Sequence, residues 1–125
     1  MAKASPRVAL VDDDASVRKA LARLLSALSV ETVAYASAKE FLISLETSSS
    51  PECLVVDLHM PEITGLELQR ELTRAGINIP TIIITAYNEP GLRERCESAG
   101  AAAFMLKPLD GKTLVAAINT AVSAH

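Results

Sequence analysis

The sequence predicts an α/β protein in which a parallel β-sheet is flanked by helices. Short apolar runs alternate along its 125 residues with longer segments whose apolar residues recur at helical spacing. Half of the residues are hydrophobic and 22% are charged, so the chain can fill a core. Because a chain of this length matches one domain, we expect a single domain of five βα units over residues 1–125, with its core at about 7–122.

The first βα unit is predicted from an apolar run and the stripe that follows it. Val8–Val11 form the expected strand, which stops at three consecutive aspartates, residues 12–14. Apolar side chains then recur with the spacing of one face of an amphipathic helix: Val17, Leu21, Leu24, Leu25 and Leu28. Asp14 is placed to cap the first turn of that helix, where a carboxylate also suits the helix dipole.

The second unit begins with a strand candidate at Thr32–Tyr35. Ser37 and Glu40 then have the spacing of a capping box, in which each side chain accepts a hydrogen bond from the other residue's backbone N–H. This spacing predicts the start of a helix whose apolar residues are Phe41, Leu42 and Leu45. A polar tract over residues 47–51 ends the unit.

The third unit contains a strand of the buried type. Leu54–Val56 form this strand, which ends at Asp57. A loop with Pro61 follows, and helical spacing resumes in a segment that carries Leu66, Leu68 and Leu72. Gly76 and Pro80 close the helix and lead to the next strand.

The fourth strand is the most apolar and β-branched run of the chain, Thr81–Thr85, and we expect it to be central in the sheet. Beyond Pro90 a short helix runs through Cys96. The fifth strand is predicted at Ala102–Leu106, and Asp110 is placed to cap a final helix whose inner residues are Leu114, Val115 and Ile118.

Composition excludes several classes of function. Aromatic residues make up 3% of the chain and the net charge is −3, so neither stacking platforms nor a basic surface is present for nucleic acid. No apolar run approaches the roughly 20 residues that cross a bilayer, and the polar start at residues 1–6 is not a signal peptide. We therefore expect a cytoplasmic protein without direct nucleic-acid or membrane contact. Cys53 and Cys96 fit neither a disulfide framework nor a C-x-x-C motif and are expected to be reduced thiols.

Polar side chains stand where the predicted strands end. Asp12 and Asp13 follow the first strand, Asp57 the third, Thr85 ends the fourth and Lys107 follows the fifth. In a parallel α/β sheet the carboxyl ends of all strands lie on one edge, which carries the binding site. The second strand supplies nothing comparable, which suits a place at the side of the sheet.

This set of residues indicates a phosphoryl site with a divalent metal. Three neighbouring carboxylates repel one another unless a cation is present, and an all-oxygen ligand set favours Mg²⁺ over zinc. The hydroxyl of Thr85 and the ammonium of Lys107 would complete a pocket for a phosphoryl group. Asp57 is the natural nucleophile because a carboxylate can form an acyl phosphate.

Each residue taken alone also has an ordinary structural interpretation. The aspartates at 12–14 could end a strand and cap a helix, Thr85 could be a β-branched strand end, and Lys107 could be a solvated surface charge. The joint arrangement, not any single member, carries the functional interpretation.

From Val8 to about Val122 the sequence resembles the receiver domain of bacterial two-component response regulators. Four motifs in order carry the resemblance: Val11-Asp12-Asp13, Val56-Asp57 with Met60-Pro61 and Gly65, Ile84-Thr85-Ala86, and Leu106-Lys107-Pro108. The segment 60–68 looks most like receivers attached to LuxR-type or FixJ-type transcription regulators. The resemblance implies a flavodoxin-like (βα)₅ fold with strand order 2-1-3-4-5.

The resemblance also implies a role for each site residue. Asp57 would accept a phosphoryl group from a sensor histidine kinase in a Mg²⁺-dependent phosphorelay. The ligands of Mg²⁺ would be Asp12, acting mostly through water, Asp13, Asp57 and the backbone carbonyl of His59. Lys107 would pair with the phosphate, and its bond to Pro108 would be cis.

Switch and flanking residues are implied in the same way. Thr85 would move toward the phosphate and let Phe104 turn inward, which changes the face formed by the fourth helix, fifth strand and fifth helix. Many receivers have Tyr where this chain has Phe104, so ring packing alone would couple here, or the ring is a fixed core aromatic. His59, Tyr87 and Ala86 would flank the phosphate, with the Tyr87 ring limiting attack by water; His59 could also be an ordinary loop residue.

Two other functions remain possible alternatives. One is a receiver-like module that binds proteins without phosphorylation. The other is a Mg²⁺-dependent phosphohydrolase with an aspartate nucleophile, although the haloacid dehalogenase type needs a second Asp where this sequence has His59. We expect self-phosphorylation and autodephosphorylation but no enzymatic turnover. We expect either a stand-alone receiver that docks to partners or, favoured by the LuxR-type resemblance, the N-terminal part of a transcription regulator whose DNA-binding output domain is absent from this chain. A homodimer on phosphorylation is a family-level expectation.

Overall fold

The computed structural model describes residues 6–124, so the predicted polar start lies outside the described residues except for Pro6. Five strands alternate with five helices along this part of the chain. The strands are β1 (Arg7–Val11), β2 (Glu31–Tyr35), β3 (Cys53–Asp57), β4 (Thr81–Thr85) and β5 (Ala103–Leu106). The helices are α1 (Ala15–Ala27), α2 (Ala38–Thr47), α3 (Gly65–Arg74), α4 (Leu92–Ser98) and α5 (Gly111–Ala124).

All four strand pairings are parallel, and the order in the sheet is β2-β1-β3-β4-β5. This confirms the predicted α/β class and strand order. β2 lies at one side of the sheet, as its lack of site residues suggested, and its residues are exposed or half-buried. β4 is an interior strand with every residue buried, but the middle position belongs to β3.

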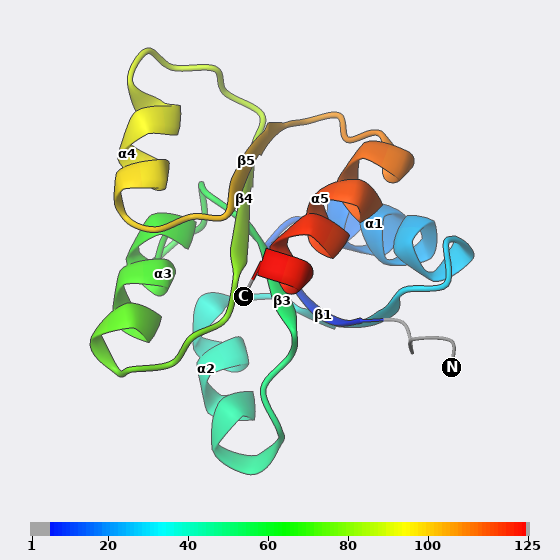
Figure 1. Ribbon diagram of the computed structural model, residues 1–125, viewed down its shortest axis with the longest axis horizontal. Coiled ribbons are helices and arrows are strands. Elements are labelled where there is room, and N and C mark those ends of the chain that lie inside the picture. Colours follow the sequence, from blue (N-terminus) through cyan, green and yellow to red (C-terminus); the bar gives the residue numbers. More distant parts are fainter. Residues whose placement is uncertain (1–5, 125) are drawn as a thin grey trace.

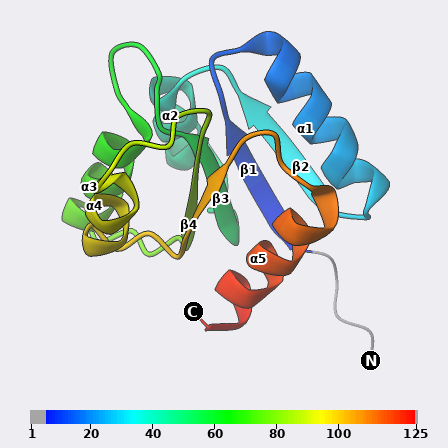
Figure 2. The same cartoon turned by 90° about the horizontal axis from the view of Figure 1, so that it is seen from above.

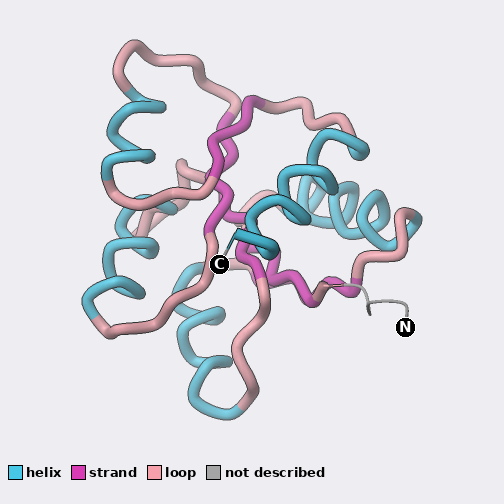
Figure 3. The backbone as a smooth tube through the Cα atoms, viewed as in Figure 1, coloured by secondary structure: helices cyan, strands magenta, loops and turns pink. Residues whose placement is uncertain are grey.

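The helices form two layers around the sheet (Figures 1 and 2). Helices α1 and α5 lie together on one face, and α2, α3 and α4 cover the other. Each layer packs on its own hydrophobic cluster: Leu10, Leu25, Ile82 and Leu114 belong to the first, and Phe41, Leu54, Leu68 and Ile83 to the second. Alternate residues of β1, β3, β4 and β5 therefore point into opposite cores, as the pleat requires. Figure 3 shows the loops that connect strands to helices at either edge of the sheet.

Helix starts follow the predicted caps with one difference. The Asp14 carboxylate accepts from the backbone N–H groups of Ser16 and Val17, and the carboxylate of Asp110 from that of Thr113. At α2 only half of the predicted capping box forms, since Ser37 accepts from Glu40 but the Glu40 carboxylate accepts from the N–H of residue 36. The complete capping box lies instead at the start of α3, where residues 64 and 67 bond each other reciprocally.

The two cysteines and the lengths of the helices can also be compared with the expectations from the sequence. Cys53 and Cys96 are both buried and free, which agrees with the expectation of reduced thiols. Burial raises the pKa of the Cys53 thiol to about 12, so this thiol is unreactive at neutral pH. Among residues 6–124, no helix has the length and apolar character that a bilayer span requires.

Candidate functional site

The predicted site residues meet at the carboxyl edge of the sheet. Asp57 and Thr85 are the last residues of β3 and β4, while Asp12 and Lys107 directly follow β1 and β5. The chain first winds from β1 outward to β2 and then returns across β1 to β3, β4 and β5 on the other side. The direction of winding therefore reverses between the neighbouring strands β1 and β3. Ligand sites of open α/β sheets lie at this reversal point.

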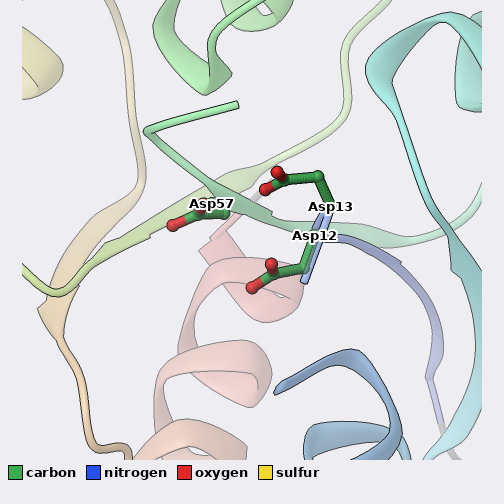
Figure 4. A group of neighbouring side chains, drawn as sticks. All are labelled: Asp12, Asp13 and Asp57. Atoms are coloured by element: carbon green, nitrogen blue, oxygen red, sulfur yellow. The ribbon is translucent and has the colours of Figure 1, made fainter. Parts of the chain in front are cut away.

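Asp12, Asp13 and Asp57 form an acidic cluster whose carboxylates project to the same side (Figure 4). One oxygen from each residue lies within 4.8 Å of the other two. Asp12 is fully buried and Asp57 is 5% exposed, whereas Asp13 is exposed to solvent. The cluster thus has two carboxylates fixed inside the protein and one at the opening.

Lys107 reaches back into this cluster from the loop after β5. Its Nζ lies 3.0 Å from Asp12 Oδ2 and 3.2 Å from Asp57 Oδ1. The lysine side chain is 18% exposed, so it is not the solvated surface charge that the sequence also allowed. The peptide bond between Lys107 and Pro108 is cis, as the family resemblance implied.

The charges of the cluster shift the pKa of two of its members. Burial raises the pKa of the Asp57 carboxyl above its ordinary value, the nearby charge of Asp12 adds to this effect, and the charge and hydrogen bond of Lys107 offset only part of the rise. For Lys107, burial acts to lower the pKa, but the hydrogen bonds and charges of Asp12 and Asp57 outweigh burial and raise it. Lys107 is therefore a permanent cation at neutral pH.

Asp12 is held at every polar atom. Its Oδ1 accepts from the N–H of Asp14 at 3.0 Å, its Oδ2 from Lys107, and its N–H donates to the Tyr35 carbonyl at 3.2 Å. The main-chain oxygen of Asp12 accepts from Nη1 of Arg18 at 2.8 Å. The sequence patterns did not single out Arg18, because the path of its long side chain leaves no local signal.

Gly65 allows α3 to begin against the end of β3. A Cβ atom at this position would lie 2.7 Å from the main-chain oxygen of Asp57, a contact closer than real side chains make. The Gly65 N–H also donates to the Leu58 carbonyl at 3.0 Å. The glycine of the sequence motif thus has a physical reason, because a side chain there would push on the backbone that carries Asp57.

Thr85 is fully buried and joins two loops of the site. Its Oγ1 accepts from the N–H of Tyr87 at 3.1 Å, and its main-chain oxygen accepts from the N–H of Lys107 at 2.8 Å. Ala86, between Thr85 and Tyr87, is exposed. The end of β4 is therefore linked to both the loop before α4 and the loop after β5.

His59, Tyr87 and Glu89 form an exposed group at the same edge, called here the loop group. The rings of His59 and Tyr87 pack edge to face with centroids 5.0 Å apart, and His59 Nε2 lies 3.8 Å from Glu89 Oε1. The sequence singled out His59 and Tyr87 separately but did not predict their contact or the part of Glu89. Such contacts between two loops leave no local sequence pattern.

Phe104 of β5 lies in the core at 6% exposure. The guanidinium carbon of Arg93, on α4, lies 5.1 Å from the centroid of its ring. This distance is within the range of a cation–π contact, so the ring is held by packing and by Arg93.

The donor set of the acidic cluster fits a hard divalent cation. All three candidate ligands are carboxylates, and the part of the chain that the structure describes brings neither Cys nor a His side chain into this cluster. Burial and, to a smaller extent, the charges of Asp12 and Asp13 raise the pKa of Asp57, and a bound cation would favour its ionised form. Oxygen ligands with room for water are typical of Mg²⁺ sites.

Comparisons with known proteins identify the family. The model of the response regulator receiver domain matches residues 8–119. The transcriptional regulatory protein TdiR of Thauera aromatica is 35% identical over 118 residues, which cover 94% of this chain and 52% of TdiR. The transcriptional regulatory protein FixJ of Rhizobium meliloti is 36% identical over 114 residues, which cover 91% of this chain and 55% of FixJ. The chain thus spans about half the length of these relatives.

A solved structure agrees with the fold. The crystal structure described as FixJ-N superposes with a TM-score of 0.88 at 34% identity, covering 100% of this chain and 98% of that one. Family match, sequence relatives and three-dimensional likeness all cover nearly the whole chain. The protein therefore belongs to the response regulator receiver domain family.

Proposed function

We propose that this receiver domain accepts a phosphoryl group on Asp57 in a Mg²⁺-dependent reaction and that the phosphate switches its output surface. The observation that carries the proposal is the position of Lys107, whose ammonium lies within 3.2 Å of Asp57 and 3.0 Å of Asp12. A half-buried lysine beside a buried aspartate, in a cluster of three carboxylates, is suited to hold a phosphoryl group.

The acidic cluster would hold the metal ion. Asp13 and Asp57 would be direct ligands, Asp12 would act mostly through water, and the main-chain carbonyl of His59 would complete the protein ligands. Bound Mg²⁺ would offset the negative charge that builds up on phosphoryl oxygens during transfer. The proposal agrees with the family, whose receiver domains generally bind Mg²⁺.

Asp57 would act as the nucleophile. A carboxylate oxygen of Asp57 attacks phosphorus, a P–O bond forms, and the bond from phosphorus to the donor atom breaks with its electron pair leaving on the donor. With a phosphohistidine of a sensor kinase as donor, the leaving atom is the imidazole nitrogen. Lys107 would then exchange part of its contact with Asp57 for the phosphoryl oxygens.

The response would spread from Thr85. Its buried hydroxyl would turn from the Tyr87 N–H toward the phosphate, and the loops tied to β4 would follow. Phe104 of β5, whose ring packs under Arg93 of α4, would then change position and alter the face made of α4, β5 and α5. Because relatives such as TdiR and FixJ are transcriptional regulatory proteins, we propose that this face acts on a DNA-binding output domain, through a homodimer of receivers.

The test is the intact mass of the protein after incubation with a small acyl phosphate, with and without Mg²⁺. The proposal predicts a gain of one phosphoryl group that requires Mg²⁺ and is lost in Asp57→Asn. The matched control is Asp110→Asn, which removes the exposed cap carboxylate of α5, outside the acidic cluster, and is expected to be phosphorylated like the parent.

Three other outcomes would contradict the proposal. A gain that persists in Asp57→Asn would assign the acceptor to another residue. No gain from an acyl phosphate or a phosphorylated kinase would favour a module that binds partners without phosphorylation. Repeated turnover of phosphomonoesters would instead favour a phosphohydrolase.

A further inference from the structure

We propose that Arg18 is a positioning residue of the metal site, which acts by fixing the direction of Asp13. The inference rests on the proposed Mg²⁺-dependent function of the acidic cluster. Arg18 lies on α1, where its own N–H donates to the Asp14 carbonyl at 2.9 Å as part of the first helical turn. Its side chain turns back past this turn, and Nη1 donates to the main-chain oxygen of Asp12 at 2.8 Å.

The bond from Arg18 orients the peptide that joins Asp12 to Asp13. A peptide unit is planar, so fixing the carbonyl oxygen of Asp12 also fixes the N–H and Cα of Asp13. The guanidinium is charged, which makes this hydrogen bond stronger than one between neutral groups. The direction in which the Asp13 carboxylate leaves the backbone therefore depends on Arg18.

The three carboxylates of the cluster differ in what else holds them. The Asp12 side chain accepts from Asp14 N–H and from Lys107, and Asp57 contacts Lys107 inside the protein. The Asp13 carboxylate is exposed and has no hydrogen-bond donor among residues 6–124. Loss of Arg18 would consequently leave Asp12 and Asp57 in place and free Asp13, the proposed direct ligand at the opening.

A positioning role and a purely electrostatic role of Arg18 predict opposite changes in Mg²⁺ affinity when the side chain is removed. The direction of the measured change therefore distinguishes the two roles. If Arg18 acted only as a nearby positive charge, its removal would tighten Mg²⁺ binding because a repulsion is lost. If Arg18 positions Asp13, its removal weakens binding. Loss of a group that orients a ligand typically costs about tenfold in metal affinity.

The experiment is calorimetric titration of the parent, Arg18→Ala, Arg18→Gln and Arg23→Ala with MgCl₂. Arg23 is the matched control, because it is an exposed arginine of the same helix and its removal changes the net charge equally. We expect about tenfold weaker Mg²⁺ binding in Arg18→Ala and a smaller loss in Arg18→Gln, which keeps an amide donor. Arg23→Ala should bind Mg²⁺ like the parent.

A second readout separates positioning from stability. In amide NMR spectra the Mg²⁺-induced shift of Asp13 should be reduced in Arg18→Ala while that of Asp57 is kept, and saturating Mg²⁺ should restore acyl phosphate labelling. Equal or tighter Mg²⁺ binding in Arg18→Ala would overturn the inference, as would an equal loss in Arg23→Ala. If Arg18→Ala does not fold, Arg18→Gln decides by the same signs. A parent chain that binds no Mg²⁺ would contradict the proposed function itself, and the inference with it.

Discussion

The cluster of Asp12, Asp57 and Lys107 and the loop group of His59, Tyr87 and Glu89 lie at the same edge of the sheet but are held differently. In the first group both carboxylates are buried, and the half-buried ammonium of Lys107 contacts both within 3.2 Å. In the loop group Tyr87 is 59% exposed, and His59 Nε2 lies 3.8 Å from Glu89 Oε1. One group is fixed by short bonds inside the core and the other rests on loose contacts between two loops.

This difference indicates a division of roles. Group transfer needs reacting atoms in a fixed arrangement, so substitutions in the buried cluster are expected to change stability and to reduce activity. Side chains of the loop group can vary at little cost to the fold, because surface substitutions usually change stability by less than about 0.5 kcal/mol. We therefore expect the loop group to affect how long the phosphate survives rather than whether it forms.

Replacement of Lys107 should have the largest effect. Lys107→Met leaves the carboxylates of Asp12 and Asp57 facing each other without their cation, so the free energy of unfolding should fall by about 2–3 kcal/mol at neutral pH. Denaturant unfolding without Mg²⁺ measures this loss. The double variant with Asp12→Asn should recover part of it, since one of the two repelling charges is gone. Unchanged unfolding of Lys107→Met would show that the buried contacts contribute nothing to stability.

Gly65→Ala tests the backbone that carries Asp57. The added Cβ would meet the Asp57 carbonyl at 2.7 Å, so either the start of α3 or the end of β3 must shift, at a cost of about 1–3 kcal/mol. Phosphorylation by an acyl phosphate should slow as well. Gly76→Ala, just beyond the other end of α3, is the comparison: its Cβ would enter open space, its φ of 74° costs about 1 kcal/mol, and labelling should stay normal. Equal labelling of both variants would contradict the account of Gly65.

The raised pKa of Asp57 gives a pH-dependent prediction for the Mg²⁺-free protein. Folding favours the protonated carboxyl, so its contribution is present below the unfolded pKa of 3.8 and is lost as pH rises through the higher folded pKa. Asp57→Asn does not ionise and should therefore be more stable than the parent at neutral pH without Mg²⁺, with the difference vanishing toward pH 3.8. Saturating Mg²⁺ should reverse the order, because it stabilises the parent. Thermal unfolding against pH checks both signs.

Tyr87 should show the smallest effect on stability. Tyr87→Ala removes a ring packed on His59, so the phosphorylated protein should lose its phosphate faster while the unfolding free energy changes by less than about 0.5 kcal/mol. Tyr87→Phe keeps the ring and should behave like the parent. The measurement is the decay of phosphorylated mass with time. If phosphorylated Tyr87→Ala lost its phosphate at the parent's rate, the Tyr87 ring would have no part in protecting the phosphate.

Sequence patterns were sufficient for the fold and for the members of the buried cluster, for a common reason. Apolar runs at strand length and stripes at helical spacing are local, and parallel strands bring their carboxyl ends to one edge, so Asp12, Asp57 and Lys107 could be placed together before any coordinates. The place of β3 rather than β4 at the middle of the sheet could not be read from apolar character, because both strands are entirely buried.

Contacts made by long side chains were beyond sequence patterns. The bond of Arg18 to a main-chain oxygen, the contact of His59 with Glu89 and the position of Arg93 over Phe104 depend on rotamers and loop paths. Residue spacing alone also did not decide where a capping box forms. At Ser37 one of its two hydrogen bonds is present, whereas at Thr64 both are.

The most direct test of the central claim is to locate the phosphoryl group within the chain. After acyl phosphate labelling in Mg²⁺, the protein is reduced with borohydride, which converts an aspartyl phosphate to homoserine, and its peptides are sequenced by mass spectrometry. We predict conversion at Asp57 alone in the parent and in Tyr87→Ala, and none in Asp57→Asn. Conversion at Asp12 or Asp13, or at a residue outside the acidic cluster, would contradict the assignment of Asp57 as the acceptor.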